Sequence, residues 1–175
     1  SGSAFAQGRE QAPPPQCRNA ADAAGWQACL DALSPDSPWR ALPLINLGSD
    51  AFMRDDYAAA VRYYDQARPP AGQELHSDII FHTFRGVSYW RVGRREEAQR
   101  DAVIVYRMLQ RDPSLNMSAQ DYFPAGLNPE IVYVYILPVL QAGDPQRFEA
   151  ALAAFRALPV TGGWGSYTNR AGVLQ

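Results

Sequence analysis

The two cysteines are the residues whose chemistry is easiest to assign. Cys17 and Cys29 are the only cysteines in the 175 residues, and an even pair of thiols in an exported chain predicts a disulfide. One continuous helix would separate their Cα atoms by about 18 Å, whereas a disulfide tolerates about 7 Å at most. Either Gly25 breaks the helix, or Cys17 lies on an extended lead-in that folds back along a helix beginning near Ala20. The alternative is a pair of buried free thiols in a cytosolic protein.

The N-terminal residues have features that are typical of an exported protein. Ala4-Phe5-Ala6, followed by Gln7, has the small-x-small form of a secretory cleavage site. Ser1-Gly2-Ser3 has the composition of a vector remnant. Together with the cysteine pair, this predicts a bacterial protein that is periplasmic or secreted.

The ionisable side chains predict neither a catalytic site nor a metal site. His76 and His82 lack the cysteine and carboxylate neighbours that a metal requires. Asp78 and His82 are one helical turn apart and can interact, but no nucleophile accompanies them. Glu96-Glu97 and Asp55-Asp56 stand at expected helix starts, where negative charge complements the helix dipole. We therefore expect no enzyme activity, no cofactor and no metal.

The composition and charge restrict the classes of partner that we expect this chain to bind. The net charge is −2 with no long run of one sign, which disfavours nucleic acid because phosphate binding needs clustered positive charge. No apolar run approaches the roughly 20 residues that span a bilayer, so we expect no integral membrane segment. The length suits one domain. We assign a flexible leader to residues 1–16, a helical domain to 17–158 and a tail to 159–175.

Apolar residues at helical spacing predict an all-α fold. Proline, glycine and capping aspartates punctuate the pattern. The expected helices cover residues 19–33, 43–53, 55 or 56 to 67, 77 or 78 to 93, 95–110, 129–138 and 145–158. Pro138 should kink or end the sixth of these. Residues 131–137 are also rich in β-branched and aromatic side chains and compete as a strand, but a lone strand has nothing to pair with.

Small residues recur at a fixed offset. Gly48 and Gly86 are 38 positions apart, as are Ala60 and Ala98, and Phe52 aligns with Trp90. Two helices can approach closely only where small residues meet, and each pair can then stack on the next. The offset predicts repeated helix hairpins.

These positions resemble the tetratricopeptide repeat family. Its pattern of large and small residues is matched by Leu44, Leu47, Gly48, Phe52, Tyr57, Ala60, Tyr64 and Ala67, then by Gly86, Tyr89, Gly93, Ala98 and Ala102, and weakly by Phe148, Ala151, Phe155 and Leu158. The resemblance implies stacked antiparallel helix hairpins, an α-solenoid of two to three repeats with an extra N-terminal helix. The spacing of 38 rather than the family's 34 leaves the curvature open.

The same resemblance implies a function. Such stacks hold a peptide or protein segment in a groove lined by the first helix of each hairpin. Carried onto this chain, the predicted groove residues are Ile45, Ser49, Phe52, Met53, Thr83, Val87, Trp90, Arg91 and Tyr133. They form either an open groove or one filled by the extra N-terminal helix or the C-terminal tail. The alternative function is a self-associating assembly protein of the cell envelope, a homo-oligomer.

Overall fold

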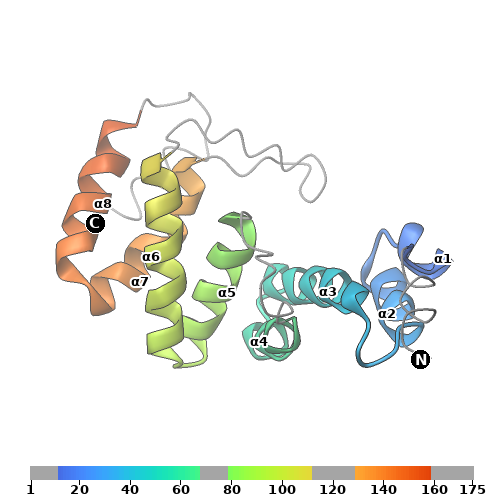
Figure 1. Ribbon diagram of the computed structural model, residues 1–175. Helices are drawn as coiled ribbons and strands as arrows, with labels where there is room; N and C mark the ends of the chain where they lie inside the picture. The colour runs from blue at the N-terminus through green and yellow to red at the C-terminus, as the bar shows by residue number, and fades with distance from the viewer. Residues whose placement is uncertain (1–11, 68–78, 112–128, 159–175) are drawn as a thin grey trace, which may run out of the picture. The chain divides into compact units, whose positions relative to one another are not determined.

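The computed structural model describes residues 12–67, 79–111 and 129–158, and every regular element in these ranges is a helix. The chain forms two compact units, which divide between Ser77 and Asp78. The boundary falls inside the range that the sequence assigns to one helical domain. Figure 1 shows the helices of each unit in chain order.

The first unit contains a short N-terminal pair of helices followed by a longer pair. Its elements are α1 (Pro15–Arg18), α2 (Ala23–Asp31), the 3-10 turn η2 (Pro38–Arg40), α3 (Ala41–Met53) and α4 (Tyr57–Gln66). Helix α3 is the centre of this unit, because α2 packs on it from one side and α4 from another. Its buried side chains include Leu44, Leu47 and Phe52.

The second unit contains two helix pairs. Its elements are α5 (Ile79–Arg91), α6 (Arg95–Arg111), α7 (Pro129–Gly143) and α8 (Pro145–Ala157). Helices α5 and α6 lie side by side (Figure 1), α7 packs on both of them, and α8 packs on α7. The core between them is apolar and includes Phe84, Val105, Leu140 and Phe155.

The pairs α3–α4 and α5–α6 repeat each other in register. Helices α3 and α5 end at residues 53 and 91, which are 38 apart, and α4 and α6 begin at residues 57 and 95, which are again 38 apart. Gly48 and Gly86 each lie five residues before the end of their helix. The offset that the sequence predicts is therefore present in the helix boundaries of both pairs.

Each of these glycines marks a close contact with the second helix of its pair. A Cβ atom on residue 48 would lie 2.7 Å from Cε1 of Tyr64, and one on residue 86 would lie 2.9 Å from Cβ of Asp101. Real Cβ atoms do not approach other carbons so closely. The predicted role of Gly48 and Gly86, to let paired helices approach, is confirmed within each pair.

The turn inside each pair also repeats. Asp55 has a φ of 59° and Gly93, 38 positions later, a φ of 86°. The next residue closes the turn by donating its backbone N–H to a carbonyl of the first helix. Asp56 donates to Ala51 at 2.9 Å and Arg94 to Tyr89 at 2.8 Å. A left-handed residue after a helix, closed by such a bond, ends that helix and reverses the chain.

Three local expectations need correction. Gly25 does not break a helix but lies inside α2, which begins at Ala23 with Asp22 as its N-cap rather than at Ala20. The lead-in that carries Cys17 does fold back, as a short helix rather than as extended chain. Of the two outcomes expected at Pro138, a kink or an end, the end does not occur, because α7 continues to Gly143 and the surrounding apolar contacts outweigh one missing hydrogen bond. Residues 131–137 are helical, as preferred over a strand.

Enlarging either glycine should destabilise its pair. We expect Gly48→Leu and Gly86→Leu each to lower the free energy of unfolding by about 1–3 kcal/mol, because overpacking outweighs the better helix propensity of leucine. Urea unfolding followed by circular dichroism measures the change. Ala58→Leu, on the exposed side of α4, is the matched control. An equal loss of stability in the control variant, or no loss in the two glycine variants, would contradict the close helix contact at these glycines.

The two turns should respond in opposite directions to exchange of their left-handed residue. Asp55→Gly should raise stability by about 0.5–1 kcal/mol, because glycine adopts positive φ without steric cost. Gly93→Ala should lower it by about 1 kcal/mol for the same reason, since no atom lies within 4 Å of the added Cβ. Thermal unfolding of both variants checks the prediction, and shifts of equal sign would contradict it.

Candidate functional site

The predicted groove residues are divided between the two units. Four lie on α3, four on α5 and one on α7. A groove that joins all nine residues therefore stays a prediction.

In the first unit the predicted residues differ in accessibility. Met53 is 55 % exposed at the end of α3, whereas Ile45 and Ser49 are half-buried. Phe52 is buried and makes an edge-on contact with Tyr57, with ring centroids 5.7 Å apart. The hydroxyl of Ser49 is hydrogen-bonded to that of Tyr64 at 3.0 Å. Met53 is thus the member of this set that a partner can reach most easily.

In the second unit accessibility increases toward the end of α5. Thr83 is buried and its hydroxyl donates to the carbonyl of Ile79 at 2.7 Å, and Val87 is also buried. Trp90 is half-buried and Arg91 is exposed. The indole N–H of Trp90 is shielded from solvent, and no described group accepts a hydrogen bond from it.

Tyr133 is a core residue of the second unit. It is buried on α7, where its ring packs near Phe155 with centroids 6.3 Å apart. Burial raises the pKa of its hydroxyl, and the neighbouring Tyr106 adds to the rise. Tyr133 therefore contributes packing, while Trp90 and Arg91 keep accessible surface.

The strongest polar feature in the described ranges is an ionic cluster of His82, Arg85 and Asp101. Asp101 is 1 % exposed on α6 and faces α5. Arg85 binds it with two hydrogen bonds, from Nε to Oδ2 at 2.9 Å and from a terminal nitrogen to Oδ1 at 2.8 Å. Nδ1 of His82, itself 3 % exposed, lies 2.8 Å from Oδ1. The cluster ties α5 to α6 beside Gly86.

Aromatic rings cover the arginine of the cluster. The guanidinium of Arg85 lies 4.6 Å from the ring centre of Phe81 and 5.8 Å from that of Tyr89. Arg94 lies 4.5 Å from the same Tyr89 ring. Such cation–π contacts gain strength where water is excluded. They hold Arg85 in place to pair with Asp101.

The cluster resembles part of a hydrolytic site, but none of the buried hydroxyls described on α5 serves it as a nucleophile. A histidine oriented by a buried aspartate activates a hydroxyl only if that hydroxyl reaches the imidazole. The buried hydroxyls of α5 are engaged elsewhere, since Thr83 donates to Ile79 and Ser88 donates to the carbonyl of Phe84 at 2.7 Å. Across the three described ranges, no group of His, Cys, Asp and Glu side chains is arranged to hold a metal ion. We interpret the cluster as structural, and the absence of enzyme activity stays a prediction.

Sequence reasoning paired His82 with Asp78 and overlooked Asp101. Asp78 lies outside the described residues, whereas the Asp101 contact is direct. A signal was present, because Asp101 falls between Ala98 and Val105 on the apolar face of α6. An acidic residue on such a face requires a cationic or hydrogen-bonding partner on the opposing helix.

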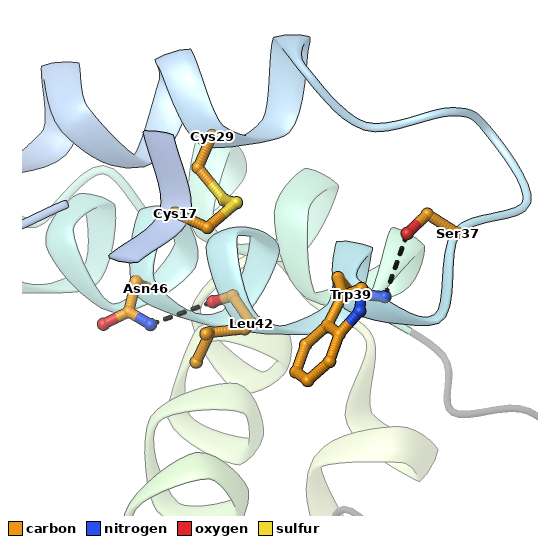
Figure 2. The surroundings of a disulfide bond; sticks show 6 residues. All are labelled: Cys17, Cys29, Ser37, Trp39, Leu42 and Asn46. Atoms are coloured by element: carbon orange, nitrogen blue, oxygen red, sulfur yellow. Dashed lines mark hydrogen bonds between the residues drawn. A yellow bond between two sulfur atoms is a disulfide. The ribbon is translucent and has the colours of Figure 1, made fainter. Parts of the chain in front are cut away.

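The predicted disulfide is present. Cys17 on α1 and Cys29 on α2 are bonded, with Cα atoms 4.5 Å apart (Figure 2). Cys29 is fully buried and Cys17 nearly so. The alternative of free thiols is therefore wrong for this structure. His76 and the Ala4-Phe5-Ala6 segment lie outside the described residues.

None of the helices described is long and apolar enough to cross a membrane. The chain matches no protein-family model, no curated protein and no solved structure. Its function therefore has to be inferred from its own residues.

Removing the buried carboxylate should destabilise the second unit. Asp101→Ala leaves Arg85 and His82 without their shared partner, and breaking a buried ion pair costs about 3–5 kcal/mol. Glu97→Gln is the control, because Glu97 pairs with Arg94 at the surface, where ion pairs contribute less than about 1 kcal/mol. Chemical unfolding measures both variants. Equal losses would show that the cluster contributes no more than a surface pair.

Alkaline titration should identify Tyr133 as a core residue. Its raised pKa favours the protonated hydroxyl in the folded state. The stabilisation that comes from this protonated hydroxyl is complete below the pKa of about 10 that tyrosine has in the unfolded chain. It is lost as the pH rises through the pKa of Tyr133 in the folded state. Ultraviolet absorbance of tyrosinate and unfolding at alkaline pH test this. In Tyr133→Phe the late-titrating hydroxyl should be absent, and an unchanged titration would place Tyr133 in contact with water.

Proposed function

We propose that this chain is a non-enzymatic binding module, related in design to tetratricopeptide repeats, which binds a peptide or protein segment. The exposed end of α3 in the first unit and the exposed end of α5 in the second are separate candidate contacts. The repeated geometry of the pairs α3–α4 and α5–α6 is the observation that carries the proposal. In both pairs a glycine at the corresponding position of the first helix lies close to the second helix, and a residue with positive φ forms the turn between them. Such regularity presents equivalent side chains at a constant spacing along the chain.

Equivalent positions at the ends of the two first helices keep accessible surface. Met53 and Arg91 are 38 residues apart and both are exposed. Trp90, beside Arg91, is half-buried and carries an indole N–H to which no described acceptor is bonded. Tryptophan and arginine are enriched among residues that dominate binding energy, and methionine adapts to varied apolar surfaces. These three side chains are our candidates for partner contact.

The disulfide supports a location outside the cytosol. Disulfides persist in oxidising compartments and are rare where thiol reductants are abundant. The bonded pair and the helix lengths are compatible with an extracytoplasmic protein, which we propose to be periplasmic or secreted. A partner should therefore be sought among envelope or secreted proteins.

Replacing Trp90 should weaken binding without unfolding the chain. The immobilised full chain is incubated with envelope extract, retained proteins are identified by mass spectrometry, and the affinity of each purified candidate is then measured. We expect Trp90→Ala to weaken binding by tenfold or more, as for a central contact residue. Helical content by circular dichroism should be nearly unchanged.

Trp39→Ala is the matched control, because Trp39 is also half-buried but lies in η2 before the start of α3, and it is not among the candidate contact residues. Equal loss of binding in both variants would contradict the assignment, and a large loss of helix in Trp90→Ala would place Trp90 in the core. Light scattering distinguishes the alternative, since a self-associating protein shows a mass that grows with its concentration.

A further inference from the structure

The N-terminal helices bury almost nothing except their cysteines. Cys17 is the one buried residue of α1, and Cys29 is the one buried residue of α2. The larger apolar side chains of this segment, Trp26, Leu30 and Leu33, are only half-buried. By contrast, six of the 13 residues of α3 are buried. Hydrophobic burial therefore contributes much less to holding α1 and α2 than to holding α3.

Helix α2 covers one side of α3, α1 packs on α2, and both helices expose polar residues to solvent. Helix α2 packs on α3, and Figure 2 shows the cysteine pair above Leu42 and Asn46 of that helix. The exposed polar side chains of the two helices are Gln16, Arg18, Gln27 and Asp31. A polar outer face over an apolar neighbour is the property of a terminal cap in a stack of helices. We call residues 15–31 the N-terminal cap.

The cap has little intrinsic stability. Helices shorter than about 12 residues are marginal in water without tertiary support, and α1 and α2 have 4 and 9 residues. Asp22 caps α2 by accepting a hydrogen bond from the N–H of Gly25 at 2.8 Å. Because Gly25 has no side chain, the turn before α2 can lie against it, and an added Cβ would be 3.1 Å from Cα of Ala20. These local contacts shape the turn, and the disulfide is the one covalent link that closes it.

We propose that the N-terminal cap is a redox-dependent element, ordered on α3 while the Cys17–Cys29 bond is intact and released from it when the bond is reduced. A dithiol supplies two electrons and two protons. The sulfur–sulfur bond breaks, each cysteine becomes a thiol, and the dithiol becomes a cyclic disulfide. In the reverse reaction the two thiols pass two electrons and two protons to a disulfide oxidant. This proposal requires no partner and goes beyond the binding function proposed above.

The compartment consequently determines the state of the first unit. In a reducing compartment α3 and α4 form with the cap open, and one side of α3 is uncovered. In an oxidising compartment the bond forms and the cap closes. The change is confined to one end of the chain, because the second unit contains no cysteine.

Hydrogen exchange read by mass spectrometry on the full chain tests the proposal. It compares the oxidised protein, the protein with dithiothreitol, and the Cys17→Ser/Cys29→Ser variant with and without dithiothreitol. Reduction should accelerate exchange of the amides in residues 17–31 on the order of 100-fold, as expected for loss of a short-loop cross-link. The double variant should exchange as fast as the reduced protein and should not respond to dithiothreitol. Residues 57–66 and 79–111 should keep their protection.

Two results would overturn the proposal. Unchanged protection of residues 17–31 after complete reduction, verified by thiol alkylation, would show that packing on α3 holds the cap. Loss of protection throughout α3 and α4 would show that the bond supports the whole first unit instead of a separable cap. Gly25→Val gives an independent check, because it strains the turn with the disulfide in place. It should accelerate cap exchange in the oxidised protein, and protection equal to the oxidised wild type would also count against a marginal cap.

Discussion

The rest of the structure depends on the close approach of two helices at a glycine. In α3–α4 the ring of Tyr64 occupies the place that a side chain on residue 48 would need. In α5–α6 the Cβ of Asp101 does the same at residue 86. This approach brings the Ser49 and Tyr64 hydroxyls together in one pair, and Asp101 within reach of Arg85 and His82 in the other. A larger residue at either glycine would push these groups apart.

The two pairs share a backbone plan but stabilise it with different chemistry. The positions of His82, Arg85 and Asp101 correspond, 38 residues earlier, to Leu44, Leu47 and Tyr63. Leu44 and Leu47 are buried, so the first pair uses apolar packing where the second uses an ionic cluster. A buried ion pair contributes little net stability relative to apolar residues of similar size, but it strongly penalises arrangements that separate its partners. We infer that the cluster selects one register of α5 on α6.

Much of the helical plan could be predicted from sequence because its signals are local. Asp144 caps its helix as the sequence predicts, and Asp56 is the one of the two candidates, Asp55 and Asp56, that caps α4. The offset of Gly48 and Gly86 predicts the paired helices. The presence of each helix can be predicted from the spacing of apolar residues and from the capping residue at its start. The repeat register follows because small residues are needed wherever two helices meet.

The features that escaped prediction depend on contacts between distant residues. The partner of His82 was missed because Asp101 lies 19 positions away on another helix. The continuation of α7 through Pro138 depends on packing against α5 and α6, which a local rule for proline ignores. The predicted groove follows from the family resemblance, which cannot show that Thr83, Val87 and Tyr133 are buried in the core of their own unit. Accessibility leaves Met53, Trp90 and Arg91 as the stronger candidates.

The central claim, that each pair is built around a glycine in close contact with its second helix, is tested most directly by nuclear Overhauser spectroscopy of the isotope-labelled protein. The structure predicts strong cross-peaks between the Hα protons of Gly48 and the Tyr64 ring, and between those of Gly86 and the Hβ protons of Asp101. The Gly48 resonances should also carry a ring-current shift from Tyr64. Both cross-peaks together would establish the repeat. Absence of either one in a spectrum that resolves the glycine resonances would contradict it.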